Sequence, residues 1–300
     1  MCSSPKTHPS NGISEPTHSE IQTNEDNGIT YWRKGEPIQN FGDFLTTLFV
    51  SDLFADVIGS FCSVHLIGST ICNYVINQDL RNCDTLAQPH VAFWGCGMRE
   101  ERKLYPRFQS KCRFLGVRGP LTRRLLDLPE TTAIGDPAFL VPLLYQPAII
   151  PELASKVICI PHFYDSASDE TLLHMTMAEH VVSPRIPCER LALLRMIDII
   201  AGASFILAGS LHAAIVACAF GRPFAFFDSG LVDIPFKWRD FAFSVNVPTA
   251  FVRNIDEGRL AYRHLLEKPL RKPRLAPMLE CAPFKLKPGM ILKAEAYDAG

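Results

Sequence analysis

Short hydrophobic runs, each ended by glycine or proline, recur along the first half of the chain and alternate with amphipathic stretches. Brief apolar runs that a loop closes at the carboxyl end are typical of buried parallel strands. Amphipathic periodicity between them predicts helices over residues 43–58 and 120–128, with Pro120 suited to a first helical turn. The predicted strands cover residues 63–67, 90–94, 114–117 and 132–134.

The same alternation restarts after a proline-rich stretch at residues 142–151, which is a plausible crossing between lobes. Alternating strands and helices in two halves predict an α/β fold of two Rossmann-like lobes that face a cleft. The expected order is a disordered tail (1–27), an N-terminal α/β lobe (28–147), a C-terminal α/β lobe (148–268) and a Pro-rich, basic, solvated segment (269–300). In the second half, strands are predicted at 156–161, 204–208 and 223–227, and helices at 189–201 and 211–220.

Composition narrows the class of protein. The chain has 300 residues, 47% of them hydrophobic, and a formal net charge of −1. Near-neutral charge argues against a nucleic-acid binder, which normally carries a basic excess. The longest apolar stretch, residues 197–220, is interrupted by polar residues and is better interpreted as core than as a bilayer span. Residues 1–27 lack the basic start and apolar segment of a secretory signal, so a cytoplasmic location is expected.

The ten cysteines show no CxxC pair, which argues against a zinc ribbon or a thioredoxin-like site. Several lie inside apolar runs, where a free cysteine behaves as a small buried hydrophobic residue. We therefore expect reduced structural cysteines in a reducing compartment.

Ligands of open α/β sheets bind beyond the carboxyl ends of the strands. That rule selects a small set of residues that follow predicted strands. Arginine and a helix N-terminus both favour anions, and histidine can exchange a proton near neutral pH. Together they suit a phosphorylated or carboxylated substrate. The selected residues are Arg118, Asp136, His162, Ser210 and His212.

Each of these residues also has a purely structural interpretation. Arg118 would be a surface residue at a helix start, and Asp136 in Gly-Asp-Pro would form an Asx-type turn. His162 would be a loop residue without a task, and His212 a satisfied core group. The sequence alone leaves these alternatives open.

Several standard catalytic motifs are absent from the sequence. There is no GxGxxG after a strand, no GxxxxGK[ST], no HExxH and no GxSxG, which disfavours dehydrogenases, P-loop enzymes, zinc peptidases and α/β-hydrolases. No DxD-type acidic pair is present either, so neither a metal ion nor a metal-held sugar nucleotide is expected.

An ordered series of short motifs resembles the polysaccharide pyruvyl transferase family, closest to its succinoglycan-ketolase-like branch. The resemblance runs from about residue 31 to about residue 243. The series consists of Asn-Phe-Gly-Asp at 40–43, Gly-Ser at 68–69, Gly-Cys-Gly at 95–97, Val-Arg-Gly-Pro-Leu-Thr at 117–122, Ile-Gly-Asp-Pro-Ala at 134–138, Ser-Leu-His at 210–212 and Gly-Arg-Pro at 221–223.

The resemblance implies a fold like that of GT-B glycosyltransferases, phosphoenolpyruvate as donor and co-substrate, no further cofactor, and a sugar diol as acceptor. His212 matches the family's catalytic histidine and Arg118 its donor-binding arginine. Ser210 and Leu211 complete the motif that precedes the histidine, where relatives can carry arginine in place of Ser210. Lys237 is the nearest match to a family lysine. These four, Arg118, Ser210, Leu211 and Lys237, are the expected donor-binding residues.

The residue chemistry fits this reaction independently. Phosphoenolpyruvate needs cations for its carboxylate and phosphate, and ketal formation needs a proton donor at the enol carbon or the leaving phosphate, which His212 could supply. A second set of residues is expected to bind the acceptor or to order the loop, with helix capping as the alternative for Asp43. That set consists of Asn40, Gly42, Asp43, Asp136 and His162.

Two other functions fit the same pattern. One is a GT-B-like glycosyltransferase that uses a nucleotide sugar, and the other is a non-catalytic sugar-binding member of the fold. The basic C-terminal segment adds the hypothesis of peripheral contact with the inner face of a membrane, where a lipid-linked acceptor would lie. The sequence does not predict an oligomeric state.

Overall fold

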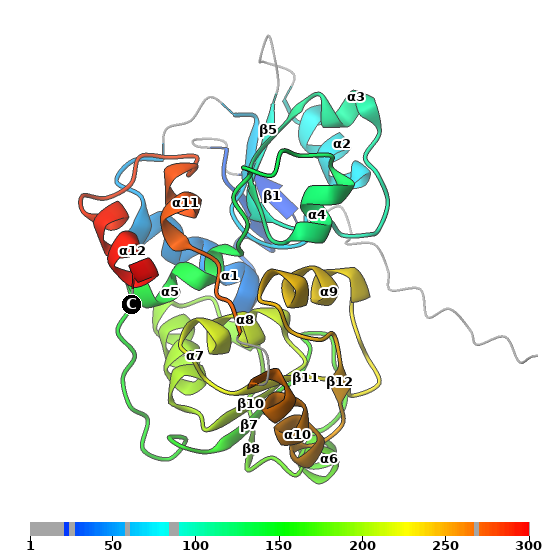
Figure 1. The fold of residues 1–300 in the computed structure, drawn as a ribbon, viewed down its shortest axis with the longest axis vertical. Helices are drawn as coiled ribbons and strands as arrows, with labels where there is room; N and C mark the ends of the chain where they lie inside the picture. The colour runs from blue at the N-terminus through cyan, green and yellow to red at the C-terminus, as the bar shows by residue number, and fades with distance from the viewer. Residues whose placement is uncertain (1–20, 24–27, 58–60, 84–89, 267–269, 300) are drawn as a thin grey trace, which may run out of the picture.

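Two parallel β-sheets form the framework of the protein in a computed structural model, which describes residues 21–23, 28–57, 61–83, 90–266 and 270–299 (Figure 1). The first sheet has the order β4 (Ser63–His65), β5 (Val91–Cys96), β6 (Cys112–Val117). Its strands pair in parallel, and all six residues of β5 are buried. Parallel bridges from Ile29 to Val64 and from Ile134 to Val117 extend the sheet on both sides. Around it lie α2 (Asn73–Arg81), α3 (Pro106–Gln109) and α4 (Pro120–Leu125).

The second sheet has five strands in the order β12-β11-β10-β7-β8, and all its pairs are parallel. Along the chain this is the doubly wound order 2-1-3-4-5, in which the direction of winding reverses between β7 and β10. In such sheets the crevice at the reversal, at the carboxyl ends of these two strands, is where ligands bind. The strands are β7 (Val157–Ile160), β8 (His180–Val181), β10 (Phe205–Ala208), β11 (Phe224–Phe227) and β12 (Phe251–Val252).

Helix α8 (Leu211–Ala219) joins the two halves of the core. All nine of its residues are buried, so it is a central helix without a solvent face. It packs on β10 and β11, on α1 (Phe41–Leu48), and on the 3-10 helix η2 (Pro137–Leu140) that follows the first sheet. A short antiparallel ribbon of β3 (Ile38–Asn40) and β9 (Arg185–Pro187) makes a second connection. The first sheet and the second are therefore held together close to the carboxyl ends of their strands.

The remaining elements cover these layers. Helix α1 continues as a π-helix, η1 (Phe49–Leu53), and α5 (Val141–Leu144) precedes the chain segment that crosses to β7. Helix α9 (Pro235–Ser244) packs against α4, and helix α10 (Ile255–Leu266) packs against β11. The helices of the second half are α6 (Asp169–Thr176), α7 (Arg190–Gly202), α9 (Pro235–Ser244) and α10 (Ile255–Leu266).

The predicted α/β class with parallel strands is confirmed. The helix predicted for residues 43–58 begins two residues earlier, at Phe41, and ends at Leu53. The strand predicted at residues 132–134 is reduced to the bridge at Ile134, because Gly135 and the capping residue Asp136 turn the chain at once into η2. Of the predicted disordered tail, residues 1–27, only Ile21–Thr23 lie within the described residues. They form β1, which pairs with β2 (Thr30–Trp32).

The expectation of a solvated C-terminal segment is wrong. Residues 270–299 fold into α11 (Leu275–Glu280) and α12 (Met290–Ala299), which pack against each other and against the first half of the chain. Leu275 is fully buried, and the indole Nε1 of Trp94 in β5 donates a 2.8 Å hydrogen bond to the carbonyl of Met278. The prolines and basic residues of this segment lie beside an apolar stretch at 275–279, and burial of that stretch stabilises the folded segment.

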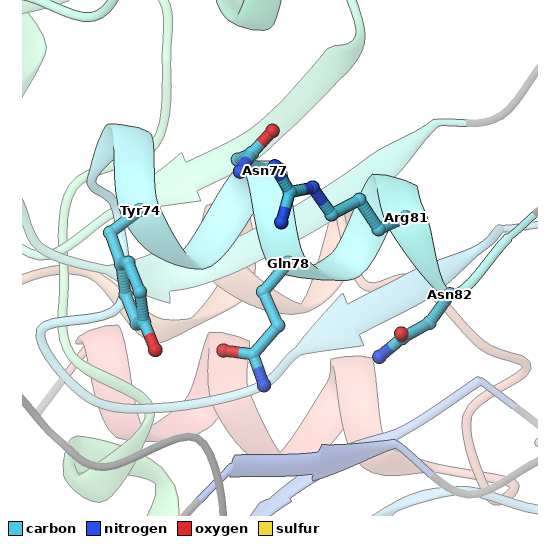
Figure 2. A pocket seen from close by; sticks show the side chains of 5 residues that line it. All are labelled: Tyr74, Asn77, Gln78, Arg81 and Asn82. Atoms are coloured by element: carbon cyan, nitrogen blue, oxygen red, sulfur yellow. The ribbon is translucent and has the colours of Figure 1, made fainter.

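A hollow with a volume of about 360 Å³ lies over the outer face of α2 (Figure 2). Four of the lining residues lie on one face of α2, three or four positions apart in sequence, and the fifth directly follows the helix. No residue predicted for the site lines this hollow. The lining residues are Tyr74, Asn77, Gln78, Arg81 and Asn82.

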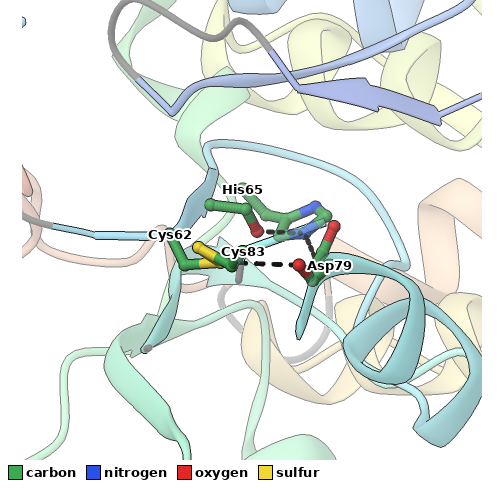
Figure 3. Close-up of a disulfide and its surroundings, with 5 residues drawn as sticks. Cys62, His65, Asp79 and Cys83 are labelled. Carbon is green, nitrogen blue, oxygen red and sulfur yellow. Dashed lines mark hydrogen bonds and ion pairs between the residues drawn. A yellow bond between two sulfur atoms is a disulfide. The ribbon is translucent and has the colours of Figure 1, made fainter. Parts of the chain in front are cut away.

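A disulfide joins Cys62, just before β4, to Cys83, just after α2 (Figure 3). The expectation that all cysteines are free is therefore wrong for this pair, whose Cα atoms lie 5.8 Å apart. The two residues are 21 positions apart in sequence, and only the packing of α2 beside β4 brings them together. Next to them, Nε2 of His65 lies 2.7 Å from Oδ2 of Asp79, and both side chains are buried. The end of α2 is thus attached to β4 by a covalent bond and by the close polar contact between His65 and Asp79.

Among the described residues, no helix combines the length and the hydrophobicity that a membrane span requires.

Candidate functional site

Arg118 lies at the carboxyl edge of the first sheet, directly after β6. It is only 1% exposed, so the surface interpretation is wrong. Its Nε donates to Oδ2 of Asp136 at 2.9 Å and its Nη1 to Oγ of Ser69 at 2.8 Å. Gly97 makes room for it, because a Cβ there would lie 2.6 Å from Nη1. Three loops at the ends of neighbouring strands therefore fix the guanidinium in one orientation.

Asp136 makes two different contacts with its two carboxylate oxygens. Oδ1 accepts a 3.0 Å hydrogen bond from the backbone N–H of Ala138 and so caps η2, as an Asx-type turn does. Oδ2 accepts from Arg118. The turn interpretation and the site interpretation both hold for this residue, which is fully buried.

His212 lies in the first turn of α8, at the carboxyl end of β10. Its Nε2 is 3.7 Å from Oδ2 of Asp136, the oxygen that accepts from Arg118. Gly42 in α1 makes this position possible, since a Cβ at residue 42 would lie 1.8 Å from the His212 ring nitrogen Nδ1. Burial lowers the pKa of His212 below 6.5; the charges of Asp136 and Asp43 oppose this shift, and those of Arg118 and Lys237 add to it.

Two nitrogen atoms in this region lack a hydrogen-bond partner. Nη2 of Arg118 and Nε2 of His212 are both buried and unpaired within the part of the chain that the structure describes. Buried polar atoms of this kind are normally paired, and leaving one unpaired costs about 1–3 kcal/mol. Both side chains approach the same carboxylate oxygen, Oδ2 of Asp136, Arg118 through Nε and His212 through Nε2. A ligand with anionic oxygens could therefore satisfy both unpaired atoms.

Lys237, in α9, belongs to the same electrostatic environment. Its ammonium group forms an ion pair with Asp233, and Nε2 of His162 lies 3.4 Å from the same carboxylate oxygen. Burial lowers the pKa of Lys237; Asp233 and Asp43 counteract the shift and Arg118 adds to it. Burial also opposes ionisation of Asp233, but His162 and Lys237 outweigh it and hold the pKa of that carboxyl well below its usual range. Asp233 thus links the ends of β7 and α9.

The other predicted residues lie around these groups. Asn40, not Asp43, is the N-cap residue of α1, so capping does not explain Asp43. The Asn40 side chain donates instead to Oδ2 of Asp43 at 2.7 Å. Ser210 and Leu211 are buried at the start of α8, and Ser210 is its N-cap residue without a side-chain capping bond.

The sequence analysis did not select three polar residues that support the site. Ser69 supports Arg118, Asp233 holds Lys237 and His162, and Asp240 in α9 accepts from the backbone of Leu121 and Thr122 at the start of α4. Ser69 lies in a Gly-Ser pair at a strand end, which was a usable signal. Asp233 and Asp240 lie one turn before and about one turn after Lys237, so the charge spacing around a candidate lysine would have found them.

The model of the polysaccharide pyruvyl transferase family matches residues 68–230, more than half of the chain. The chain belongs to this family. A search of curated proteins found no match.

The matched stretch of the pyruvyl transferase family contains part of the site and leaves out the rest. Inside it lie Arg118, Asp136, His162 and the Ser210–His212 motif. Outside it lie the α1 residues Asn40, Gly42 and Asp43, and the Asp233–Lys237 pair of α9. The groups beyond the matched stretch contact or act electrostatically on those within it.

Proposed function

We propose that the protein transfers a pyruvyl group from phosphoenolpyruvate to a sugar of a polysaccharide or its precursor and forms a cyclic ketal. The observation that carries this proposal is the pair of buried, unpaired nitrogen atoms, Nη2 of Arg118 and Nε2 of His212, beside one carboxylate. An anionic donor would satisfy both. The proposed arrangement is GT-B-like, with the donor between the carboxyl edges of the two sheets, and follows the succinoglycan-ketolase-like branch.

In the proposed reaction the enol methylene of phosphoenolpyruvate takes up a proton and the neighbouring carbon gains oxocarbenium character. One sugar hydroxyl adds to that carbon and loses its proton. The second hydroxyl displaces phosphate and closes the ring, and its proton leaves with the phosphate. Over the whole reaction the two hydroxyl protons are accounted for by the new methyl group and by hydrogen phosphate. The reaction needs no cofactor beyond the co-substrate.

The residues are suited to separate roles in this scheme. Arg118 presents a fixed fork of donors to the carboxylate or phosphate, and Lys237 adds a second, partly buried cation. The first turn of α8 contributes backbone N–H groups. His212 would be the general acid. Its pKa is low in the free protein, but a bound anion would raise it and so favour the protonated imidazole when the donor is present.

Asn40, Asp43 and His162 are proposed to contact the acceptor, because they surround the same cluster from α1 and β7. A cytoplasmic location is retained as an expectation, and the Cys62–Cys83 disulfide is the feature that goes against it. The hypothesis of membrane contact through the C-terminal segment loses its support, since that segment is folded onto the core.

Phosphate release from phosphoenolpyruvate, with and without a panel of galactose-, glucose- and mannosamine-containing acceptors, tests the proposal. We expect acceptor-dependent release that is insensitive to EDTA and is lost in Arg118→Ala and His212→Ala. A thermal shift with phosphoenolpyruvate in the absence of acceptor provides a second measurement, because a ligand stabilises the state that it binds. Stabilisation by nucleotide sugars and not by phosphoenolpyruvate would contradict the proposal and favour a glycosyltransferase.

A further inference from the structure

Three chain segments converge on the ring of Phe163, which follows β7 and directly succeeds His162. The guanidinium of Arg185, in β9, lies 4.9 Å from the ring centroid, and that of Arg33, after β2, lies 5.9 Å from it. Trp32 meets the same ring edge-on at 5.1 Å and also contacts Arg33. Tyr164 packs edge-on against Phe163 at 5.1 Å, and its own side chain is 51% exposed. We call Trp32, Arg33, Phe163, Tyr164 and Arg185 the Phe163 cluster.

The backbone of Arg33 is held in place by a buried residue. Its φ of 49° lies in the left-handed region, which is uncommon for a residue other than glycine. The buried side chain of Gln39 donates at 2.8 Å to the carbonyls of both Arg33 and Glu36, and so fixes this turn. Arg33 is therefore positioned by the fold and not only by its contacts at the surface.

Within the part of the chain that the structure describes, the cluster carries more positive charge than its neighbours balance. Arg185 is exposed and has no carboxylate within ion-pair distance among the described residues, while Nη2 of Arg33 lies 3.7 Å from Glu36. A guanidinium that stacks on an aromatic ring keeps its N–H edge free for hydrogen bonds to a planar anion. The exposed ring of Tyr164 beside such donors suits an apolar sugar face with an anionic substituent.

The cluster is continuous with the proposed reaction centre. Arg185 lies directly opposite Asn40 in the β3–β9 ribbon, so their side chains share one face. Asn40 donates to Asp43, whose charge acts on both His212 and Lys237. On the other side, His162 precedes Phe163 and pairs with Asp233. A glycan that reaches His212 would therefore extend toward the Phe163 cluster.

We propose that the Phe163 cluster is an acceptor subsite for a glycan with an anionic group next to the sugar that is modified. Arg33 and Arg185 bind the anionic group and Tyr164 stacks on the sugar ring. The role of the cluster in acceptor binding rests on the proposed function. Its preference for anionic sugars does not. The anionic group is either a sugar carboxylate of the polymer or a phosphate on a precursor.

Calorimetric titration of the full-length protein tests the subsite, with digalacturonate, galactose 1-phosphate and lactose as probes, at low salt and with or without phosphoenolpyruvate. We expect one of the two charged probes to bind at least tenfold tighter than lactose. Loss of a charge-assisted bond should reduce this preference about tenfold in Arg185→Gln. Arg195→Gln, an exposed arginine of α7, is the matched control and should retain it.

Equal binding of charged and neutral probes, absence of binding, or an equal loss in Arg195→Gln would overturn the proposal. Which charged probe binds tighter distinguishes a sugar carboxylate from a sugar phosphate. Tyr164→Ala keeps both arginines and should weaken the charged probe and lactose by the same factor. The thermal shift with phosphoenolpyruvate reports on the donor site separately, so its failure would contradict the proposed reaction while the titrations still decide the subsite.

Discussion

The carboxyl edges of the two sheets meet at the site but hold polar groups of different kinds. On the first sheet, Arg118 is fixed by Asp136 and Ser69, and it carries a charge that stays constant over the whole physiological pH range. On the second sheet and α9, burial lowers the pKa of His212 and Lys237, and the hydrogen bond from His162 and the charge of Lys237 lower the pKa of Asp233 against the effect of burial. One edge thus provides a permanent cation and the other provides groups whose protonation can change.

This difference suits the proposed division of labour. A permanent, preorganised charge binds the donor in the same way at every pH, since its geometry needs no rearrangement. A group with a movable proton is needed where a bond to hydrogen forms.

The largest effect is expected at His212. Replacement of a general acid typically costs about 10²–10⁴-fold in rate, so His212→Gln should lower kcat by that factor while the KM for phosphoenolpyruvate changes little. Steady-state phosphate release measures both constants. His174→Gln, an exposed histidine of α6, is the control. Near-normal turnover in folded His212→Gln would move the proton donor elsewhere.

The pH dependence sharpens the assignment of His212. Its pKa in the free protein is lowered below 6.5 by burial. Since the protonated imidazole is the acid, kcat/KM should fall as pH rises through this lowered pKa. Bound phosphoenolpyruvate raises the pKa, so the corresponding fall in kcat should occur at higher pH. A pH profile that is identical in His212→Gln would contradict this account.

The disulfide tests the rigidity of the first sheet. Closure of a loop of 21 residues by Cys62 and Cys83 should stabilise the fold by about 3 kcal/mol. Replacement of both by serine should lower the unfolding free energy by about that amount. The KM for phosphoenolpyruvate should stay unchanged, because no site residue in the described ranges contacts the pair. Denaturant unfolding measures the loss, and Cys188→Ser, an exposed free cysteine, is the control. A stability unchanged by the double replacement would show that the bond does not constrain this sheet.

Arg118→Lys tests the permanent cation. Lysine keeps the charge but loses the planar fork that bonds Asp136 and Ser69 at once, so the KM for phosphoenolpyruvate should rise about 10- to 100-fold. Arg124→Lys, an exposed residue of α4, is the matched control. An unchanged KM would mean that charge alone suffices at this edge and that the fixed geometry has no part in donor binding.

Much of the framework was predictable because its signals are local. The apolar runs that form β4, β5, β7, β10 and β11 have glycine or proline at one end, and short apolar runs bounded in this way are typical of buried parallel strands. The rule for strand ends likewise brought Arg118, Asp136 and His212 into one region, since carboxyl ends share an edge. The sequence did not predict that Arg118 and His212 both approach Oδ2 of Asp136, because that arrangement depends on the conformation of the loops.

The parts that were mispredicted depend on contacts distant in sequence. The C-terminal segment looked solvated because its prolines and basic residues dominate locally, whereas its burial depends on Trp94 and Gly135 far away in the chain. The pairing of Cys62 with Cys83 depends on where α2 packs. Asp233 lies one turn before Lys237 in sequence, but its contact with His162 depends on where the end of β7 packs.

The smallest effect is expected at Asp233, and it separates the two edges most clearly. Removal of its charge takes away the main influence that keeps the pKa of buried Lys237 from falling further. In Asp233→Asn the ammonium should therefore be lost at lower pH than in the wild type. The KM for phosphoenolpyruvate is expected to rise as Lys237 deprotonates. In Asp233→Asn this rise should therefore begin at lower pH than in the wild type, and the KM near neutrality should be about tenfold higher than that of the wild type.

Asp233→Glu is the conservative control and should restore most of the binding if the charge is what matters. An arginine side chain stays protonated throughout, so no part of this shift can come from Arg118. If Asp233→Asn raised the KM equally at every pH, Asp233 would only shape the loop before α9. A shift of the pH profile instead requires that the second edge holds a titrating cation, which is the property that distinguishes it from the edge of Arg118.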